Sequence, residues 1–136
     1  MKLDSKSRIG TRILTDLSNF YDKRLVQAGE ISRRQNISVK YIEQLLRPLK
    51  KADLVVSTQG ARGGHMLARP PGQITLGEIV RLYGEDAGPQ ECLCKKERCM
   101  LQEICRLHQV WKEANDAFYR RLDSVTVAEL GGECCK

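Results

Sequence analysis

The sequence predicts a mainly α-helical protein with one small β-hairpin and a long C-terminal helix. Three observations carry this prediction. Apolar residues recur at helical spacing in the first fifty residues, two short β-rich runs flank a glycine-rich turn near residue 60, and an apolar series with alternating gaps of four and three runs through residues 100–122. With 136 residues and a mass of 15.4 kDa, the chain has room for one modest core, and two full enzyme domains are excluded.

Two amphipathic segments open the chain. The first has an apolar face with spacings of four, four and three residues, which is typical of a helix lying on a core, made by Ile9, Ile13, Leu17 and Phe20. The second covers Ala28 to Arg34, with Ile31 as its inward residue and Arg33 and Arg34 predicted to face outward. Asn36 is expected to end this second helix.

A third helix is predicted to follow Ser38, whose hydroxyl is a good N-cap. Its predicted buried side is apolar and comprises Tyr41, Ile42, Leu45, Leu46 and Leu49. Its outward side is polar and comprises Lys40, Glu43, Gln44 and Arg47, and Pro48 should kink or shorten its last turn. Two helices joined by a tight turn over residues 35–37 have the form of a helix-turn-helix, although an ordinary three-helix bundle would show the same pattern.

A β-hairpin directly after these helices favours the first alternative. Residues 54–58 and 65–69 are β-rich, and the turn between them holds Gly60, Gly63 and Gly64. Such a hairpin is the wing of a winged helix-turn-helix, and Arg62 at its tip could enter a minor groove or touch phosphate, unless the tip is simply a soluble turn. Thr75 and Glu78 suggest a capping box that opens a short helix, so the winged domain is expected to span residues 1–83.

The charge of the chain is unevenly divided. Residues 1–70 hold 14 Lys/Arg against 6 Asp/Glu, a balance of +8, whereas residues 71–136 hold 9 against 11, a balance of −2. A basic N-terminal half suggests contact with a polyanion such as double-stranded DNA, and an aromatic content of 5% argues against a base-stacking platform for single strands. No apolar run is long enough for a membrane span or resembles a secretory signal, so we expect a cytoplasmic protein without membrane contact.

The second half of the chain is predicted to consist of a cysteine-rich loop (84–99), a long helix (100–123) and a C-terminal segment with a flexible tail (124–136). From residue 100 to 122 the helix would measure roughly 35 Å at ~1.5 Å per residue, which is long for so small a domain. Part of its apolar stripe is therefore expected to meet a second copy of the chain in a homodimer, with Trp111 and Phe118 as the heaviest anchors.

All six cysteines lie between Cys92 and Cys135, and four thiols fall within fourteen residues, at Cys92, Cys94, Cys99 and Cys105. His108 follows three residues after Cys105 and is expected on the same face of the long helix. Thiolates with one histidine suit Zn²⁺ or an iron–sulfur cluster, and spacing alone does not separate the two. The alternative is a set of free cysteines beside a solvated histidine.

The order of these parts resembles the Rrf2 superfamily of bacterial winged-helix regulators, with its IscR, NsrR and CymR branches. The resemblance rests on the stretches ISRRQNISVKYIEQLLRPLKKADLV, GARGGHMLAR and ITLGEIV, and it extends to about Leu130. It implies a homodimeric transcription factor that binds promoter DNA, with Ser38, Lys40, Glu43 and Gln44 at base-reading positions. Tyr41 and Arg47 on the same helix and Arg62 on the wing are also expected to contact DNA.

The resemblance also implies an iron–sulfur cluster, 2Fe–2S or 4Fe–4S, held by three cysteines. Cluster-binding relatives usually space these cysteines C-x5-C-x5-C, which fits Cys99 and Cys105 but leaves the first ligand open between Cys94 and Cys92. His108 stands where the IscR-like branch has its histidine ligand, with Asp4 as a weaker alternative. Gln59 stands where that branch often has an arginine before the wing glycine, so the recognised promoter sequence is expected to differ.

Two functions follow from these patterns. The first is a regulator whose cluster responds to oxygen, nitric oxide or iron shortage, and the second is a cluster-free winged-helix repressor controlled by thiol oxidation or by a partner protein. An enzyme is not expected, because the sequence has no Ser/His/Asp constellation and no phosphate-binding glycine loop before a helix, and His65 and His108 are its only histidines.

Overall fold

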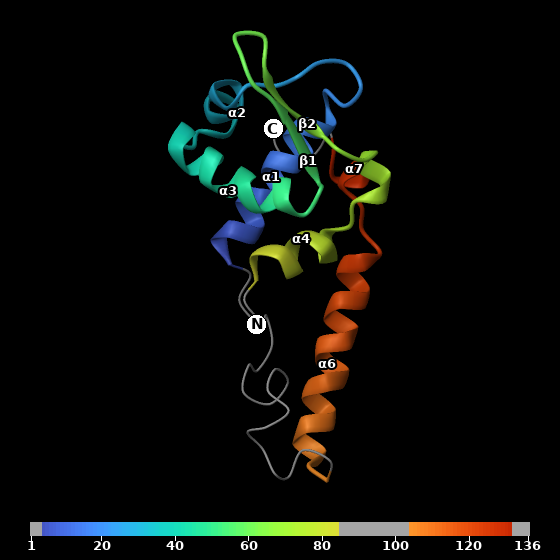
Figure 1. The fold of residues 1–136 in the computed structure, drawn as a ribbon. Coiled ribbons are helices and arrows are strands. Elements are labelled where there is room, and N and C mark those ends of the chain that lie inside the picture. Colours follow the sequence, from blue (N-terminus) through green and yellow to red (C-terminus); the bar gives the residue numbers. More distant parts are fainter. Residues whose placement is uncertain (1–3, 85–103, 132–136) are drawn as a thin grey trace.

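The computed structural model describes residues 4–84 and 104–131. Figure 1 shows a body of short helices around a two-stranded hairpin, from which one long helix extends away. The elements, in chain order, are α1 (Ser5–Ser18), α2 (Ala28–Gln35), α3 (Val39–Lys51), β1 (Val55–Thr58), β2 (Gly64–Leu67), the 3₁₀ turn η1 (Pro71–Gln73), α4 (Leu76–Tyr83), α6 (Arg106–Asp123) and α7 (Val127–Leu130). The predicted fold class, mainly helical with a small hairpin, is confirmed.

The core lies between α1, α3 and α4. The apolar faces predicted for α1 and α3 supply part of it, and Ile13, Leu17, Ile42 and Leu46 are almost completely buried. The Tyr83 hydroxyl donates a hydrogen bond to the Leu45 carbonyl oxygen at 2.6 Å, which ties α4 to α3. Burial raises the pKa of Tyr83, so this phenol stays protonated and keeps its donor.

The hairpin is antiparallel and pairs Val55 with Leu67 at its base and Thr58 with Gly64 near its tip. Val26 joins it as a third, single-residue strand: its backbone N–H donates to the His65 carbonyl at 2.9 Å and its carbonyl accepts from the His65 N–H at 2.7 Å. This bridge fixes the wing to the segment that enters α2. It was not predicted from the sequence.

The C-terminal segment returns to the winged domain. The Leu76 N–H donates to the Val125 carbonyl and the Val127 N–H donates to the Ile74 carbonyl, both at 2.9 Å, and Val127 is completely buried. Thr75 and Thr126 thereby form an antiparallel bridge at the start of α4. Residues 125–127 therefore pack against the predicted winged domain, and Val127 belongs to its core; residues 132–136 lie outside the described part of the chain.

The long helix is shorter than predicted. Cys105 is its N-cap and Arg106 its first residue, so Ile104 and Cys105 precede the helix instead of lying within it, and Met100 lies outside the described residues. None of the 18 residues of α6 is buried. Among the helices of the described segments, none combines the length and the apolar character needed to cross a membrane.

Candidate nucleic-acid interface

The turn between α2 and α3 is built by three local signals. Asn36 adopts the left-handed conformation at φ 55° and ends α2, as predicted. The Ile37 N–H donates to the Ser32 carbonyl at 3.2 Å, which closes the turn. The Ser38 hydroxyl oxygen accepts from the Tyr41 N–H at 3.3 Å and caps α3, which then continues through Pro48 to Lys51. The predicted helix-turn-helix is thus present.

A groove of about 480 Å³ separates the outward face of α3 from the wing. Three predicted DNA-contact residues line it, namely Glu43, Arg47 and Gln59. The remaining lining side chains come from the start of α2, from α3 and from the hairpin, and those with polar groups are Gln27, Lys50, Ser57, Thr58 and His65. Figure 1 places α2, α3 and the hairpin tip together at the end of the body opposite to α6.

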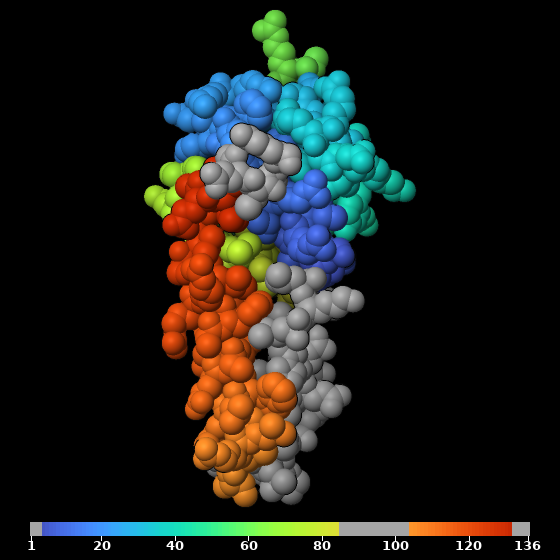
Figure 2. All heavy atoms as spheres, turned by 180° about the vertical axis from the view of Figure 1, so that it is seen from behind, coloured from blue at the N-terminus to red at the C-terminus, as the bar shows by residue number. Residues whose placement is uncertain are grey.

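The wing tip is a tight turn over Gly60, Ala61, Arg62 and Gly63, closed by a hydrogen bond from the Gly63 N–H to the Gly60 carbonyl at 3.0 Å. Gly60 has a φ of 110°, and a Cβ on Gly63 would overlap the Thr58 carbonyl, so both positions require glycine. Arg62 is exposed on this turn, and Figure 2 shows the tip projecting from the molecular surface. The Arg62 side chain is thereby presented at the outermost point of the wing.

His65 lines the groove and is absent from the contact residues predicted from the sequence. Its backbone pairs with Val26, its Nδ1 lies 2.6 Å from the Ser57 hydroxyl, and its ring lines the groove. Burial, together with the positive charge of Lys50, lowers the pKa of His65. The ring is therefore neutral at physiological pH and serves as a hydrogen-bonding group in the middle of the wing. The sequence signal that could have identified it is a histidine at the start of the strand that follows the glycine-rich turn.

An ion-pair network holds α2 against α1 beneath this interface. Arg34 binds the buried Asp16 carboxylate at 2.6 Å, and Arg24 binds Glu30 at 2.8 Å. Both guanidinium groups lie over the Phe20 ring, at 4.9 and 4.3 Å from its centroid. Hydrogen bonding from Arg24 lowers the pKa of Glu30 to about 2. Arg34 is exposed, as predicted, but its ion pair with Asp16 was not predicted, because Asp16 lies 18 residues away in the sequence.

The structure exposes most of the predicted DNA-contact residues, namely Ser38, Lys40, Glu43, Gln44, Arg47, Gln59 and Arg62. Tyr41 differs from the others, because its side chain is partly buried and packs against the core. At α4 the capping box is half formed: the Thr75 hydroxyl accepts from the Glu78 N–H at 3.2 Å, while the Glu78 carboxylate pairs with Arg69.

Of the predicted metal ligands, Cys105 and His108 lie in the described residues, whereas Cys92, Cys94 and Cys99 lie outside them. Cys105 is a free, half-buried thiol at the N-cap of α6, and His108 is half-buried on the first turn. Within residues 4–84 and 104–131, no three His, Cys, Asp or Glu side chains are grouped closely enough to hold a metal ion. The ligand set therefore stays a prediction.

The start of α6 carries exposed apolar side chains. Ile104, Leu107, Val110 and Trp111 are 80%, 56%, 49% and 40% exposed, respectively. Phe118, the other predicted dimer anchor, is half-buried and packs edge-on against Tyr119 with ring centroids 5.3 Å apart. The exposed stripe is thus concentrated in the half of the helix that lies farther from the body.

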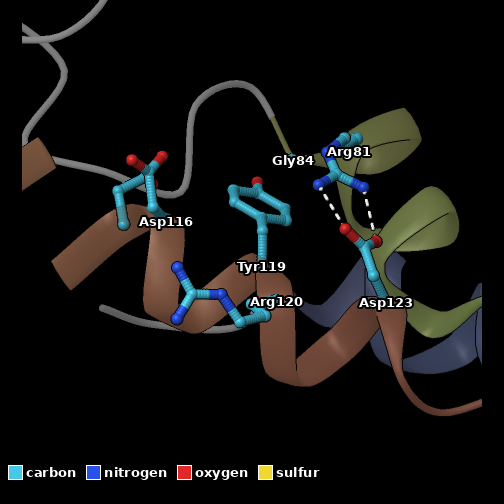
Figure 3. Close-up of a pocket in the computed structure, with 7 residues that line it drawn as sticks. Arg81, Gly84, Asp116, Tyr119, Arg120 and Asp123 are labelled. Carbon is cyan, nitrogen blue, oxygen red and sulfur yellow. Dashed lines mark hydrogen bonds and ion pairs between the residues drawn. The ribbon is translucent and has the colours of Figure 1, made fainter. Parts of the chain in front are cut away.

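The opposite end of α6 is joined to α4 by polar contacts. Arg81 binds the Asp123 carboxylate through two hydrogen bonds of 2.7 and 2.8 Å and lies 4.2 Å from the centroid of the Tyr119 ring (Figure 3). The same ion pair lowers the pKa of Asp123. These residues border an open hollow of about 720 Å³ that is also lined by Gly84, Asn115 and Arg120. The Arg81–Asp123 pair thus joins the C-terminal end of α6 to α4.

A helix-turn-helix followed by a β-hairpin, with a polar groove between the second helix and the hairpin, defines a winged helix-turn-helix protein. The chain belongs to the Rrf2 family: the family model, described as an iron-dependent transcriptional regulator, matches residues 3–133. The resemblance proposed from the sequence is confirmed. Members of this family are DNA-binding transcriptional regulators and not enzymes.

Individual relatives agree with this assignment. The chain is 40% identical over 130 residues to protein rrf2 of Nitratidesulfovibrio vulgaris (strain Hildenborough), an alignment that covers 96% of this chain and 87% of the relative. It is 35% identical to the HTH-type transcriptional regulator IscR of Sodalis glossinidius, with 96% and 78% coverage. Its fold is similar to that of CymR, the global cysteine regulator of B. subtilis, with a TM-score of 0.76, 31% identity and 96% and 95% coverage.

Proposed function

We propose that this regulator binds double-stranded promoter DNA as a homodimer and responds to its signal through an iron–sulfur cluster. The observation that carries the DNA-binding part is the groove between α3 and the wing, where exposed polar and cationic side chains from two separate elements meet. The protein is expected to act in the cytoplasm, where promoter DNA is found.

The proposed contacts follow the exposure of the side chains. Ser38, Lys40, Glu43, Gln44 and Arg47 on the outward face of α3 would enter the major groove, and Tyr41 could contribute only its outer edge. Gln59 and Arg62 on the wing would contact the minor groove or phosphates. The Ser38 hydroxyl oxygen accepts from the Tyr41 N–H in the cap, and its own O–H can still donate, which suits a phosphate oxygen.

Two variants test these assignments by fluorescence anisotropy with specific and nonspecific duplexes. Gln44→Ala should reduce discrimination between them by about 1–3 kcal/mol, because a bidentate base contact is lost. Arg62→Ala should weaken both complexes alike and flatten the salt dependence, because phosphate contacts carry no sequence information. Equal loss of specific and nonspecific affinity in Gln44→Ala would exclude a base-reading role.

The cluster part rests on the donor set. A free thiol at Cys105 and an imidazole at His108 share the beginning of α6, and these donor types suit an iron–sulfur centre. Cys99 would supply a second thiolate and Cys94 the third, with Cys92 as its competitor. When bound, the cluster would supply a redox-sensitive centre on the segment that joins the winged domain (residues 4–83) to α6. His108 would make its retention sensitive to protonation.

Anaerobic purification tests this part. Visible absorption accompanied by iron and acid-labile sulfide is expected for the wild-type protein, and Cys99→Ala and Cys105→Ala should lose both. Loss in Cys92→Ala but not in Cys94→Ala would move the third ligand to Cys92. Cys134→Ala and Cys135→Ala serve as controls, because a tail behind two glycines is poorly positioned to supply a ligand.

A cluster-free regulator controlled by thiol oxidation or by a partner protein is the second candidate. The free, half-buried thiol of Cys105 favours it, together with the similarity to CymR, a cysteine regulator. A colourless dimer that binds DNA when reduced and releases it after mild oxidation would support this candidate over the first.

A further inference from the structure

Exposed large apolar side chains are unevenly distributed over the described residues. Ile104 and three residues of α6 account for most of them, and the winged domain adds only two, Val39 at 41% exposure and Val56 at 46%. Val56 lies on β1 and is absent from the lining of the groove, whereas Val39 lines it together with Glu43 and Arg47. The other apolar side chains that line the groove, Ala28 and Leu46, are buried, so the exposure of Val39 needs an explanation.

Packing within the folded chain does not explain the exposure of Val39. Val39 is the first residue of α3, directly after the N-cap Ser38. The start of the helix is held by other groups: the Tyr41 N–H is capped by Ser38, Ile37 packs against the core, and Ile42 is completely buried. Val39 is therefore not needed to anchor α3, and leaving it exposed to water costs the free protein favourable burial.

Its position is the one from which a recognition helix contacts bases, because the N-terminal residues of that helix approach the base edges in the major groove. Thymine is the only standard base with a methyl group there, and small apolar side chains contact that methyl. Valine suits this contact, because its β-branched side chain is nearly fixed in a helix and loses little rotamer freedom on binding.

We infer that Val39 is a specificity-determining residue that contacts the 5-methyl group of a thymine in the operator. This inference rests on the proposed DNA binding and deepens it. Glu43 and Arg47 lie on the same face and would flank the contact with hydrogen-bonding groups, so that α3 combines an apolar contact with polar ones.

The test is a double-mutant cycle between protein and DNA. The operator is first selected from a random duplex library with the full chain, and each of its thymines is then replaced by deoxyuridine, which removes only the methyl group. For the wild-type protein, one thymine per half-site should be sensitive, with about a fourfold loss of affinity, the factor expected for one methyl-sized group. Val39→Ala should bind the unmodified operator more weakly by a similar factor and should not distinguish thymine from uracil at that position.

Val56→Ala is the matched control, because it removes the same atoms from the other exposed valine of the winged domain. It should keep the full thymine preference of the wild type. Sensitivity to uracil that persists in Val39→Ala, or a wild-type protein indifferent to every replacement, would overturn the inference while leaving DNA binding intact. Failure of the wild-type chain to select any duplex would instead overturn the proposed function.

Discussion

The winged domain and α6 have similar amphipathic patterns, but their apolar faces have different surroundings. In α3 the stripe of Ile42, Leu45, Leu46 and Leu49 is at most 3% exposed, whereas no residue of the longer α6 is buried. The apolar residues of α3 are buried within their own chain. Helix α6 is joined to α4 at its C-terminal end through Arg81 and Asp123, and its apolar side chains near the start of the helix, around Trp111, are exposed.

This contrast separates two kinds of stability. Residues of α3 should contribute to the free energy of unfolding of the single chain, because they lose contact with water on folding. Residues at the start of α6 should contribute instead to the proposed association with a second chain, because they are exposed in the single chain. The proposed sensor residues Cys105 and His108 lie at this open end, so a change there would act on the dimer before it reaches the winged domain.

The largest expected effect comes from truncating the buried stripe. Leu46→Ala should lower the free energy of unfolding by about 2–5 kcal/mol, because it removes a completely buried side chain and leaves a cavity. Urea denaturation followed by circular dichroism measures this loss. Leu107→Ala, which makes the same change at a side chain 56% exposed, should leave monomer stability nearly unchanged and alter only the concentration dependence of unfolding. Equal losses in the two variants would contradict the contrast.

A charge in the open stripe should break the dimer. Trp111→Asp is expected to weaken association by about 2 kcal/mol or more, because a large aromatic anchor is replaced by a charged group in the proposed interface. Sedimentation velocity at low micromolar concentration would show the monomer. Lys112→Ala, on the same turn, is the control and should stay dimeric. A Trp111→Asp protein that is folded and fully dimeric would exclude α6 as the main contact.

Packing in the winged domain should also be sensitive to a single added methyl group. A Cβ on Gly10 would overlap the ring of Tyr83, so Gly10→Ala should cost about 1–3 kcal/mol by displacing that ring and its hydrogen bond to Leu45. Gly29 on α2 has open space where its Cβ would lie, and Gly29→Ala should be neutral or stabilising by about 0.4–1 kcal/mol. Thermal unfolding of the two variants compares them directly.

The smallest effect concerns pH. Because the pKa of Glu30 in the folded chain is about 2, below its ordinary value of 4.5, its pairing with Arg24 stabilises the chain above pH 4.5 and is lost as the pH falls toward 2. Glu30→Gln should remove this dependence and cost about 0.5–1 kcal/mol at neutral pH, the range for a partly exposed ion pair. Denaturation curves between pH 2 and 7 would measure this change in the free energy of unfolding. If Glu30→Gln loses stability below pH 4.5 as the wild type does, that loss belongs to other carboxylates.

Local signals made much of the interface predictable. Apolar spacing placed α1 and α3, asparagine and serine marked the turn between α2 and α3, and glycines marked the wing tip. Each of these signals lies within a few residues of the feature it predicts, because helix caps, turns and amphipathic faces are determined by neighbouring residues. Exposure of Glu43, Gln44 and Arg47 followed from the same pattern.

Pairings between distant segments appeared only in the tertiary structure. Val26 pairs with His65, Arg34 with Asp16, and residues 125–127 with residues 74–76. No local pattern encodes them, because a backbone N–H or a guanidinium donates to any suitable acceptor that the fold brings within reach. The sequence by itself therefore determined the helices, the turn, the wing and the charged face. The tertiary structure decided which distant residues pair with one another. It also placed His65 and Val39 in the lining of the groove and left the apolar side chains at the start of α6 exposed.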